Sequence, residues 1–145
     1  MTLQSILLPL FVQAGLTFFL ILWMAKERTV LLKRREVKWQ DVALRQMPWP
    51  DRVQQISNCF QNQFEIPILF YVLVVLEVVT KKAGVPFVVM EWLFVATRLA
   101  HAYVFTTSNY VPLRGQCFIA GTIILTLMWG IFALQIFAGP LMGVL

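Results

Sequence analysis

Four long apolar stretches, separated by shorter polar segments, divide the chain of 145 residues. They cover residues 3–25, about 52–80, 85–107 and about 113–138. Each reaches the roughly 20 residues that a helix needs to cross the hydrocarbon core of a membrane. Membrane barrel strands are shorter and alternate in polarity, so the pattern favours helices. We therefore predict an all-α integral membrane protein, an antiparallel four-helix bundle that forms a single domain over residues 1–145.

Turn-forming residues separate these stretches. Residues 81–84 and 108–112 form short connections, which favour antiparallel neighbours. Prolines and glycine in 47–51 and 139–140 are expected to end helices. The first stretch has no preceding Lys or Arg and no small-residue cleavage pattern after it, so we expect a retained span and no cleavable signal.

Composition supports a membrane protein, with 59% hydrophobic and 13% charged residues. The net charge of +5 is concentrated in residues 26–52, where eight Lys or Arg face four Asp or Glu. Such a segment is typical of a cytoplasmic loop and does not indicate nucleic-acid binding. The prediction places residues 26–52 in the cytoplasm and both termini on the opposite side. Lys81 and Lys82, on that opposite side, oppose the asymmetry without reversing it.

Metal binding is not expected. Cys59 and Cys117 lack the spacing of metal ligands, and His101 is the single histidine. We interpret both cysteines as small buried apolar residues.

Polar residues inside the spans are the candidate site, because such residues are costly in a membrane and need a partner or a function. The candidates are Asn58, Asn62 and Glu65 in the second span, Arg98 and His101 in the third, and Arg114 at the start of the fourth. At about 100° per residue, the three candidates in the second span share one helix face. All six should lie near the cytoplasmic ends of their helices and converge in one leaflet.

A structural role for these residues remains open. Glu65 would then pair with Arg98 and join two helices, and Arg114 would reach the headgroups. Glu77 and Glu91 lie toward the other leaflet, where we interpret them as interfacial groups or as bonds between helices.

Two motifs resemble the MAPEG family, the membrane-associated proteins of eicosanoid and glutathione metabolism. The segment Asn62-Gln63-Phe64-Glu65-Ile66-Pro67 is similar to the family's Asn-x-x-Glu followed closely by Pro. Arg98-Leu99-Ala100-His101, followed by Pro112-Leu113-Arg114, is similar to the prostaglandin E synthase branch. The resemblance covers the whole chain, including the four spans and the long basic first loop. Within the family it is greatest to bacterial members of uncharacterised activity, which implies a bacterial inner membrane.

The resemblance implies a homotrimer that binds glutathione between subunits, near the cytoplasmic ends of the helices. Arginine forks suit the two carboxylates of glutathione, and a glutamate suits its ammonium group. A cation near the thiol would stabilise the thiolate, and Arg114 is the candidate for this catalytic role. The implied glutathione contacts are Asn58, Asn62, Glu65, Arg98, His101 and Arg114.

This chain also departs from the active eicosanoid members of the family. It has Asn58 and Gln61 where they carry arginines, and Phe105 and Phe118 where they carry tyrosines. Phenylalanine cannot donate a hydrogen bond to a sulfur.

Three functions therefore stay open. The first is a glutathione-dependent transferase or peroxidase acting on small lipophilic electrophiles dissolved in the membrane lipids. The second is a non-catalytic membrane scaffold that binds a lipid or a partner. A proton-coupled exporter is disfavoured, because the first span lacks the acidic residue that such proteins usually place there.

Overall fold

The computed structural model describes residues 2–43 and 49–138, and all regular structure within them is helical. The predicted break at 47–51 lies partly outside these residues, and that at 139–140 lies wholly outside them. The elements are α1 (Leu3–Lys33), α2 (Trp39–Ala43), α3 (Asp51–Gln61), the short 3₁₀ helix η1 (Asn62–Phe64), α4 (Ile66–Val79), α5 (Val85–Thr106) and α6 (Val111–Phe137).

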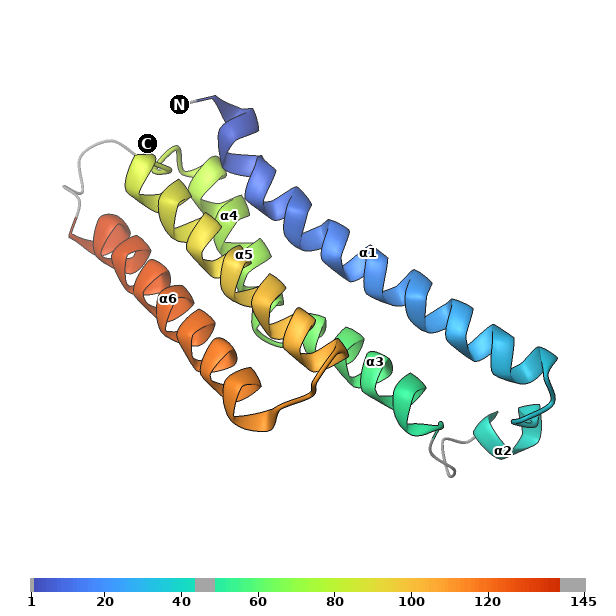
Figure 1. Cartoon of the computed structure of the whole chain (residues 1–145). Coiled ribbons are helices and arrows are strands. Elements are labelled where there is room, and N and C mark those ends of the chain that lie inside the picture. The colour runs from blue at the N-terminus through green and yellow to red at the C-terminus, as the bar shows by residue number, and fades with distance from the viewer. Residues whose placement is uncertain (1, 44–48, 139–145) are drawn as a thin grey trace.

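Four helical segments are long and apolar enough to cross a membrane, which confirms the predicted all-α membrane fold. They are α1, the combined segment Asp51–Val79, α5 and α6. Figure 1 shows them side by side in alternating directions, with α1 and α6 on opposite flanks and α5 between them. The start of α1, the end of α6 and the α4–α5 turn lie at one end of the bundle. We call this the terminal end, and the opposite end, which carries α2, the loop end.

The first helix is longer than predicted. It continues past Ala25 to Lys33, so the first charged residues after the span are helical. Two hydrogen bonds hold this extension, because Trp23 Nε1 donates to Glu27 Oε1 at 3.2 Å and Arg28 Nη2 donates to Ser57 Oγ at 2.8 Å. Charged residues with long unbranched side chains are good helix formers, which explains why the helix does not stop where the charges begin.

The prediction of one continuous second helix over 52–80 is wrong. The helix breaks after Gln61, passes through η1 and restarts as α4. Pro67, in the first turn of α4, has no N–H with which to bond the carbonyl four residues earlier. Glu65 lies at the break with φ −93° and ψ −112°, outside the helical region.

A polar layer divides the core of the bundle into two apolar clusters. Phe70 and Phe94 stack at 4.6 Å in the cluster nearer the terminal end. Leu20, Cys59, Ala102 and Phe105 form the smaller cluster nearer the loop end. Three polar residues, each almost completely buried, lie between the two clusters. They are Gln13 on α1, Gln63 in η1 and Arg98 on α5.

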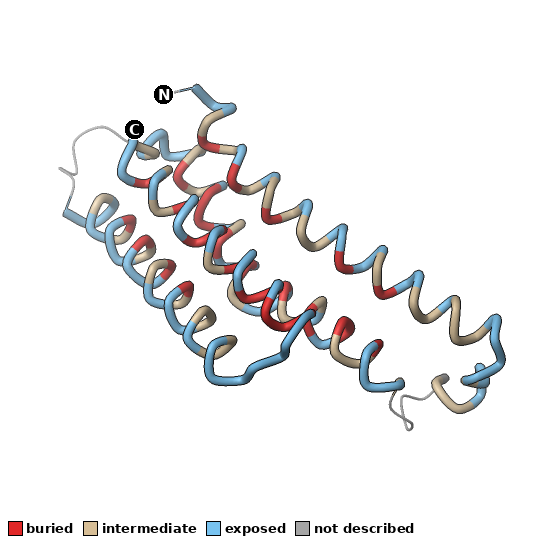
Figure 2. The backbone as a smooth tube through the Cα atoms, in the orientation of Figure 1, coloured by how far each residue is buried: buried red, intermediate tan, exposed pale blue. Residues whose placement is uncertain are grey.

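The outer surface of the bundle is apolar. Figure 2 shows buried positions on the inner faces of the helices and exposed positions around the outside. Large apolar side chains occupy that outside, including Phe18 at 69% exposure and Leu127 at 57%. An apolar surface of this extent is stable against lipid or a second protein and not against water.

Candidate functional site

The break in the second span positions Asn62 and Glu65. Both residues leave the regular helix at η1, and their side chains meet there, with Asn62 Nδ2 donating to Glu65 Oε2 at 2.7 Å. The side-chain oxygen of Asn62 accepts a hydrogen bond from Arg98. Asn62 therefore connects the cation on α5 to the carboxylate at the break.

Arg98 is completely buried and only partly hydrogen-bonded. Its Nη2 donates to the side chain of Asn62 and, at 3.4 Å, to the backbone oxygen of Asn62. Among the described residues, its Nε and Nη1 have no hydrogen-bond partner. The guanidinium carbon lies 5.8 Å from the ring centre of Phe118 on α6. Leaving buried donors of a charged group unbonded is costly, so this side chain is suited to an additional acceptor.

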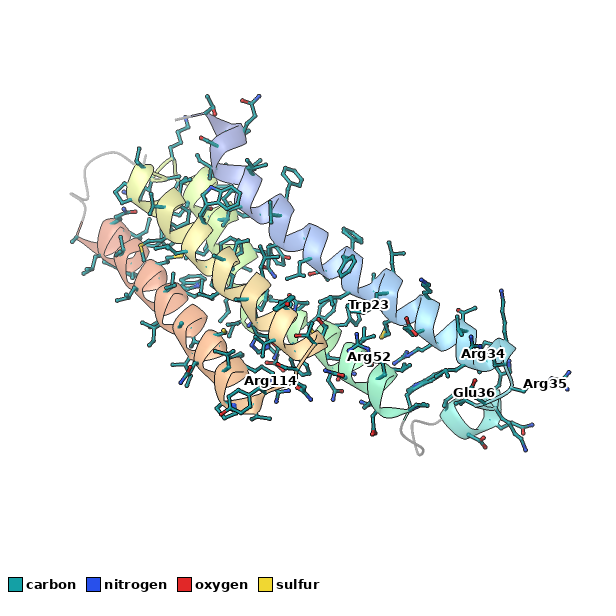
Figure 3. The ribbon with its side chains drawn as sticks, viewed as in Figure 1. Trp23, Arg34, Arg35, Glu36, Arg52 and Arg114 are labelled. Atoms are coloured by element: carbon teal, nitrogen blue, oxygen red, sulfur yellow. The ribbon has the colours of Figure 1, made fainter. Side chains whose placement is uncertain are left out.

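His101 and Arg114 link α5 to the start of α6. His101 Nδ1 lies 3.0 Å from the backbone oxygen of Arg114. The Arg114 guanidinium donates to Asn109 Oδ1 at 2.6 Å and lies 4.1 Å above the ring of Phe105. Figure 3 shows Arg114 at the beginning of α6, close to the α5–α6 turn.

A cleft of about 380 Å³ lies between the helix break and the start of α6. Two charged side chains of opposite sign, Glu65 and Arg114, line it, and Arg98 lies beside it, against Asn62 and Phe118. Apolar side chains complete its walls. The lining residues are Asn62, Glu65, His101, Phe105, Val111, Arg114, Gly115, Phe118 and Ile119.

The structure brings five of the six predicted residues to this region but leaves Asn58 outside the cleft. Asn58 is exposed on α3, where its Oδ1 accepts from Gln54 Nε2 at 2.7 Å. Asn58 lies one helical turn before Asn62, whose backbone N–H bonds the Asn58 carbonyl. The assumption of one continuous helix face therefore fails only beyond Asn62, where the helix breaks. Within the described chain, Glu65 and Arg98 form no ion pair, since Arg34 and Glu36 are the pair found there. The suggested direct Glu65–Arg98 pairing is replaced by the bridge through Asn62.

Two sets of supporting residues were not identified from the sequence. Gln13 Nε2 on α1 donates to Gln63 Oε1 at 3.0 Å, and Gln63 Nε2 donates to the Cys59 carbonyl, which ties the break to the first span. A glutamine within the apolar first span was the available signal for this bond.

The second set caps the last turn of α5. Arg52 donates to the Thr106 carbonyl, and Gln55 Nε2 donates to the Phe105 carbonyl at 2.6 Å. Terminal carbonyls of a helix lack intrahelical partners, so these side chains fix the end of α5 that carries the cleft. Figure 3 shows Arg52 on α3 facing Trp23 on α1, with 5.1 Å between the guanidinium carbon and the ring centre.

No group of three or more His, Cys, Asp or Glu side chains suited to a metal occurs in the part of the chain that the structure describes. The chemistry of the cleft is instead that of two guanidinium groups, a carboxylate, an imidazole and two aromatic rings. Such a set fits a ligand that carries carboxylates and an ammonium group.

Comparison with known protein families shows which family the chain belongs to. The sequence model of the MAPEG family matches residues 6–134, which is nearly the whole chain. The chain belongs to the MAPEG family. No curated protein and no solved structure matches it in the corresponding searches. Members of the MAPEG family are generally associated with glutathione and are typically trimeric.

The residues around the cleft fit glutathione. Arg98 lies beside the cleft with two buried nitrogens that have no partner among the described residues, and Glu65 lines the cleft with a carboxylate suited to an ammonium group. Arg114 adds a second cation, which suits either the other carboxylate or a thiolate.

Proposed function

We propose that this MAPEG protein binds glutathione in the cleft and transfers it to, or uses it to reduce, lipophilic electrophiles. The observation that carries the proposal is Arg98, a fully buried guanidinium whose Nε and Nη1 lack partners within the described residues. A buried cation requires a counter-charge, and the cleft beside it has room for a peptide-sized anion.

Each charged residue then has a role. Arg98 holds one carboxylate of glutathione. Asn62 fixes the positions of Arg98 and Glu65 relative to each other, because its side chain is hydrogen-bonded to both. Glu65 binds the ammonium group. Arg114 stabilises the developing thiolate from the start of α6, since a nearby cation favours the ionised form of a thiol.

The proposal includes a homotrimer in which the neighbouring subunit completes the cleft. Val111 and Ile119 line it and are exposed at 59% and 58%, so one apolar wall is open in the single chain. A neighbouring subunit would cover that wall, and a lipid-dissolved electrophile would enter laterally from the membrane. The protein would reside in a bacterial inner membrane with the loop end toward the cytoplasm, which supplies glutathione.

Isothermal titration calorimetry of the detergent-solubilised protein tests the binding site. We expect Glu65→Gln and Arg114→Ala each to weaken glutathione binding by about tenfold or more, because each removes a charge-assisted hydrogen bond. Glu36→Gln and Arg34→Ala are matched controls, because they remove the same groups from an exposed ion pair far from the cleft. Unchanged affinity in both cleft variants would remove the proposed site.

A non-catalytic scaffold is the second candidate. Phe105 and Phe118 favour it, because they line the cleft where family members with eicosanoid activity carry tyrosine donors. A conjugation assay with a general aromatic electrophile separates the two functions. Glutathione binding and trimer assembly without turnover would establish the scaffold, whereas turnover that falls in Arg114→Ala would establish the transferase.

A further inference from the structure

His101 is held by one ring nitrogen while the other is unused. The ring is 3% exposed and lines the cleft, and its Nδ1 lies 3.0 Å from the Arg114 carbonyl oxygen. A carbonyl oxygen only accepts hydrogen bonds, so Nδ1 carries the hydrogen. In the neutral ring Nε2 is then the acceptor, which fixes the tautomer.

Nothing in the described chain uses this acceptor. Nε2 of His101 is buried and has no hydrogen-bond partner among residues 2–43 and 49–138. The nearest rings are those of Phe105 and Phe118, whose centres lie 5.6 and 6.0 Å from the imidazole. Neither ring has an O–H or N–H to offer. A buried acceptor left in this state is suited to a donor supplied by a ligand.

We propose that His101 accepts the thiol proton of glutathione through Nε2. This inference rests on the proposed glutathione site and adds the destination of the proton, which neither Arg114 nor Arg98 can take because both already carry their full complement of protons. The S–H bond breaks, its electron pair stays on sulfur, and a new N–H bond forms at Nε2.

The surroundings of His101 act differently on the two products of this transfer, because burial and the neighbouring Arg98 and Arg114 cations disfavour a positive imidazolium but favour a thiolate. The thiolate next to Nε2 then supplies the counter-charge that the imidazolium needs. Nδ1 keeps its bond to the Arg114 carbonyl, whose oxygen stabilises the positive imidazolium. The guanidinium of Arg114, in the same cleft, and that of Arg98 beside it stabilise the thiolate. When the sulfur attacks an electrophile, the proton on Nε2 is available to the displaced group. His101 thus takes a catalytic role that the phenylalanines at 105 and 118 cannot fill.

Two substitutions separate proton transfer from positioning. In His101→Asn the side-chain amide replaces Nδ1 and keeps the bond to the Arg114 carbonyl, but no atom remains at the Nε2 position. In His101→Gln the side chain reaches the Nε2 position with an amide oxygen, which accepts a hydrogen bond but not a proton. Both are compared with the native protein after each variant shows the native elution volume and thermal midpoint.

The experiment measures thiolate absorbance and proton release together when glutathione binds. Calorimetry in buffers of different ionisation enthalpy gives the number of protons released, and S-methylglutathione, which has no S–H, gives the reference. We expect the native protein to form thiolate without releasing a proton to the buffer. His101→Asn should lose the thiolate signal. In this variant the ratio of the affinity for glutathione to the affinity for S-methylglutathione should fall about tenfold. His101→Gln should regain part of this ratio but not the signal.

The outcomes distinguish the two proposals. If both ligands bind and the native protein releases one proton for each thiolate formed, His101 is not the acceptor, although the binding site stands. An identical thiolate signal in His101→Asn has the same meaning. If neither ligand binds the native protein, the glutathione site and the role of His101 both fall.

Discussion

At the residue scale, two buried glutamates differ from the buried Arg98 of the candidate site, because the Arg98 side chain has a hydrogen-bond partner and their carboxylates have none among the described residues. Glu77 on α4 and Glu91 on α5 are completely buried, and their carboxylate oxygens have no hydrogen-bond partner in the described parts of the chain. Full burial is not an exposed interfacial position, and the described chain shows no hydrogen bond that would make either carboxylate a bond between helices. An ionised Glu77 opposes a negative charge on Glu91, whereas Lys82 favours the charge on Glu77. A negative charge on the buried side chain of Glu91 is therefore unfavourable.

Removing this acidic group should therefore stabilise the protein. We expect Glu91→Gln to raise the thermal midpoint by a few degrees, or about 1 kcal/mol, because it removes a buried ionisable group that has no hydrogen-bond partner in the described residues. Differential scanning fluorimetry in detergent measures the change.

Glu36→Gln is the control for that experiment. It breaks a 3.8 Å ion pair with Arg34 on the surface, and such pairs contribute about 0–1 kcal/mol, so the midpoint should barely move. A fall of several degrees in Glu91→Gln would show that the carboxylate has a favourable partner in the assembled protein.

At the scale of elements, the packing of α5 against α6 depends on one glycine. A Cβ added at Gly121 would lie 2.7 Å from Thr97 Oγ1 and 3.8 Å from Cδ of Arg98. Thr97 is held in place because its hydroxyl donates to the Phe94 carbonyl at 2.6 Å. Small residues at such contacts let two membrane helices approach closely. This contact lies one turn from the cleft, so it also fixes the position of Arg98.

Gly121→Ala should destabilise the protein by about 1–3 kcal/mol, since an extra methyl in a packed interface forces α5 and α6 apart. Displacing Arg98 should also weaken glutathione binding. Thermal midpoint and calorimetric affinity measure the two effects. The double variant Thr97→Ala with Gly121→Ala removes the clashing hydroxyl and should recover part of the loss, which a double-mutant cycle would quantify.

Gly130→Ala is the matched control on the same helix. A Cβ there meets nothing within 4 Å, so the helix gains about 0.5–1 kcal/mol from reduced backbone entropy in the unfolded chain. Equal destabilisation by both substitutions would show that the α5–α6 contact is not tight.

At the scale of the whole molecule, charge asymmetry predicts orientation. Residues 26–52 carry eight Lys or Arg, whereas the turn at the terminal end between α4 and α5 carries Lys81 and Lys82. The positive-inside rule then places the loop end in the cytoplasm. The cleft lies between the helix break and the start of α6, which is nearer the loop end, so this predicted orientation would place the proposed glutathione site on the cytoplasmic side.

Cysteine labelling tests this orientation. Lys38 and Lys82 are exposed near opposite ends of the bundle, and Cys59 and Cys117 are first replaced by alanine. We expect Lys38→Cys to react with a membrane-impermeant maleimide in inside-out vesicles and Lys82→Cys in right-side-out vesicles. The reverse pattern would place the cleft away from the cytoplasm.

The sequence by itself determined the membrane fold of this MAPEG protein and the level of its polar site. Continuous apolar stretches are a local property, and the cost of polar groups in lipid forces helices upon them. The same cost marked Asn62, Glu65, Arg98 and Arg114 as residues in need of partners, and their order along alternating helices placed them at one end.

Only the tertiary structure decided how those residues meet. Pro67 breaks the second span, and at the break Asn62 bridges Arg98 to Glu65. Helix periodicity assumes an unbroken helix, so it placed Asn62 and Glu65 on one face but did not show that Asn62 would connect Glu65 to Arg98. The contact between His101 and the Arg114 carbonyl also joins two helices through a backbone atom. Side-chain identities do not encode such a contact, because every residue carries a carbonyl and only packing selects the one that is reached.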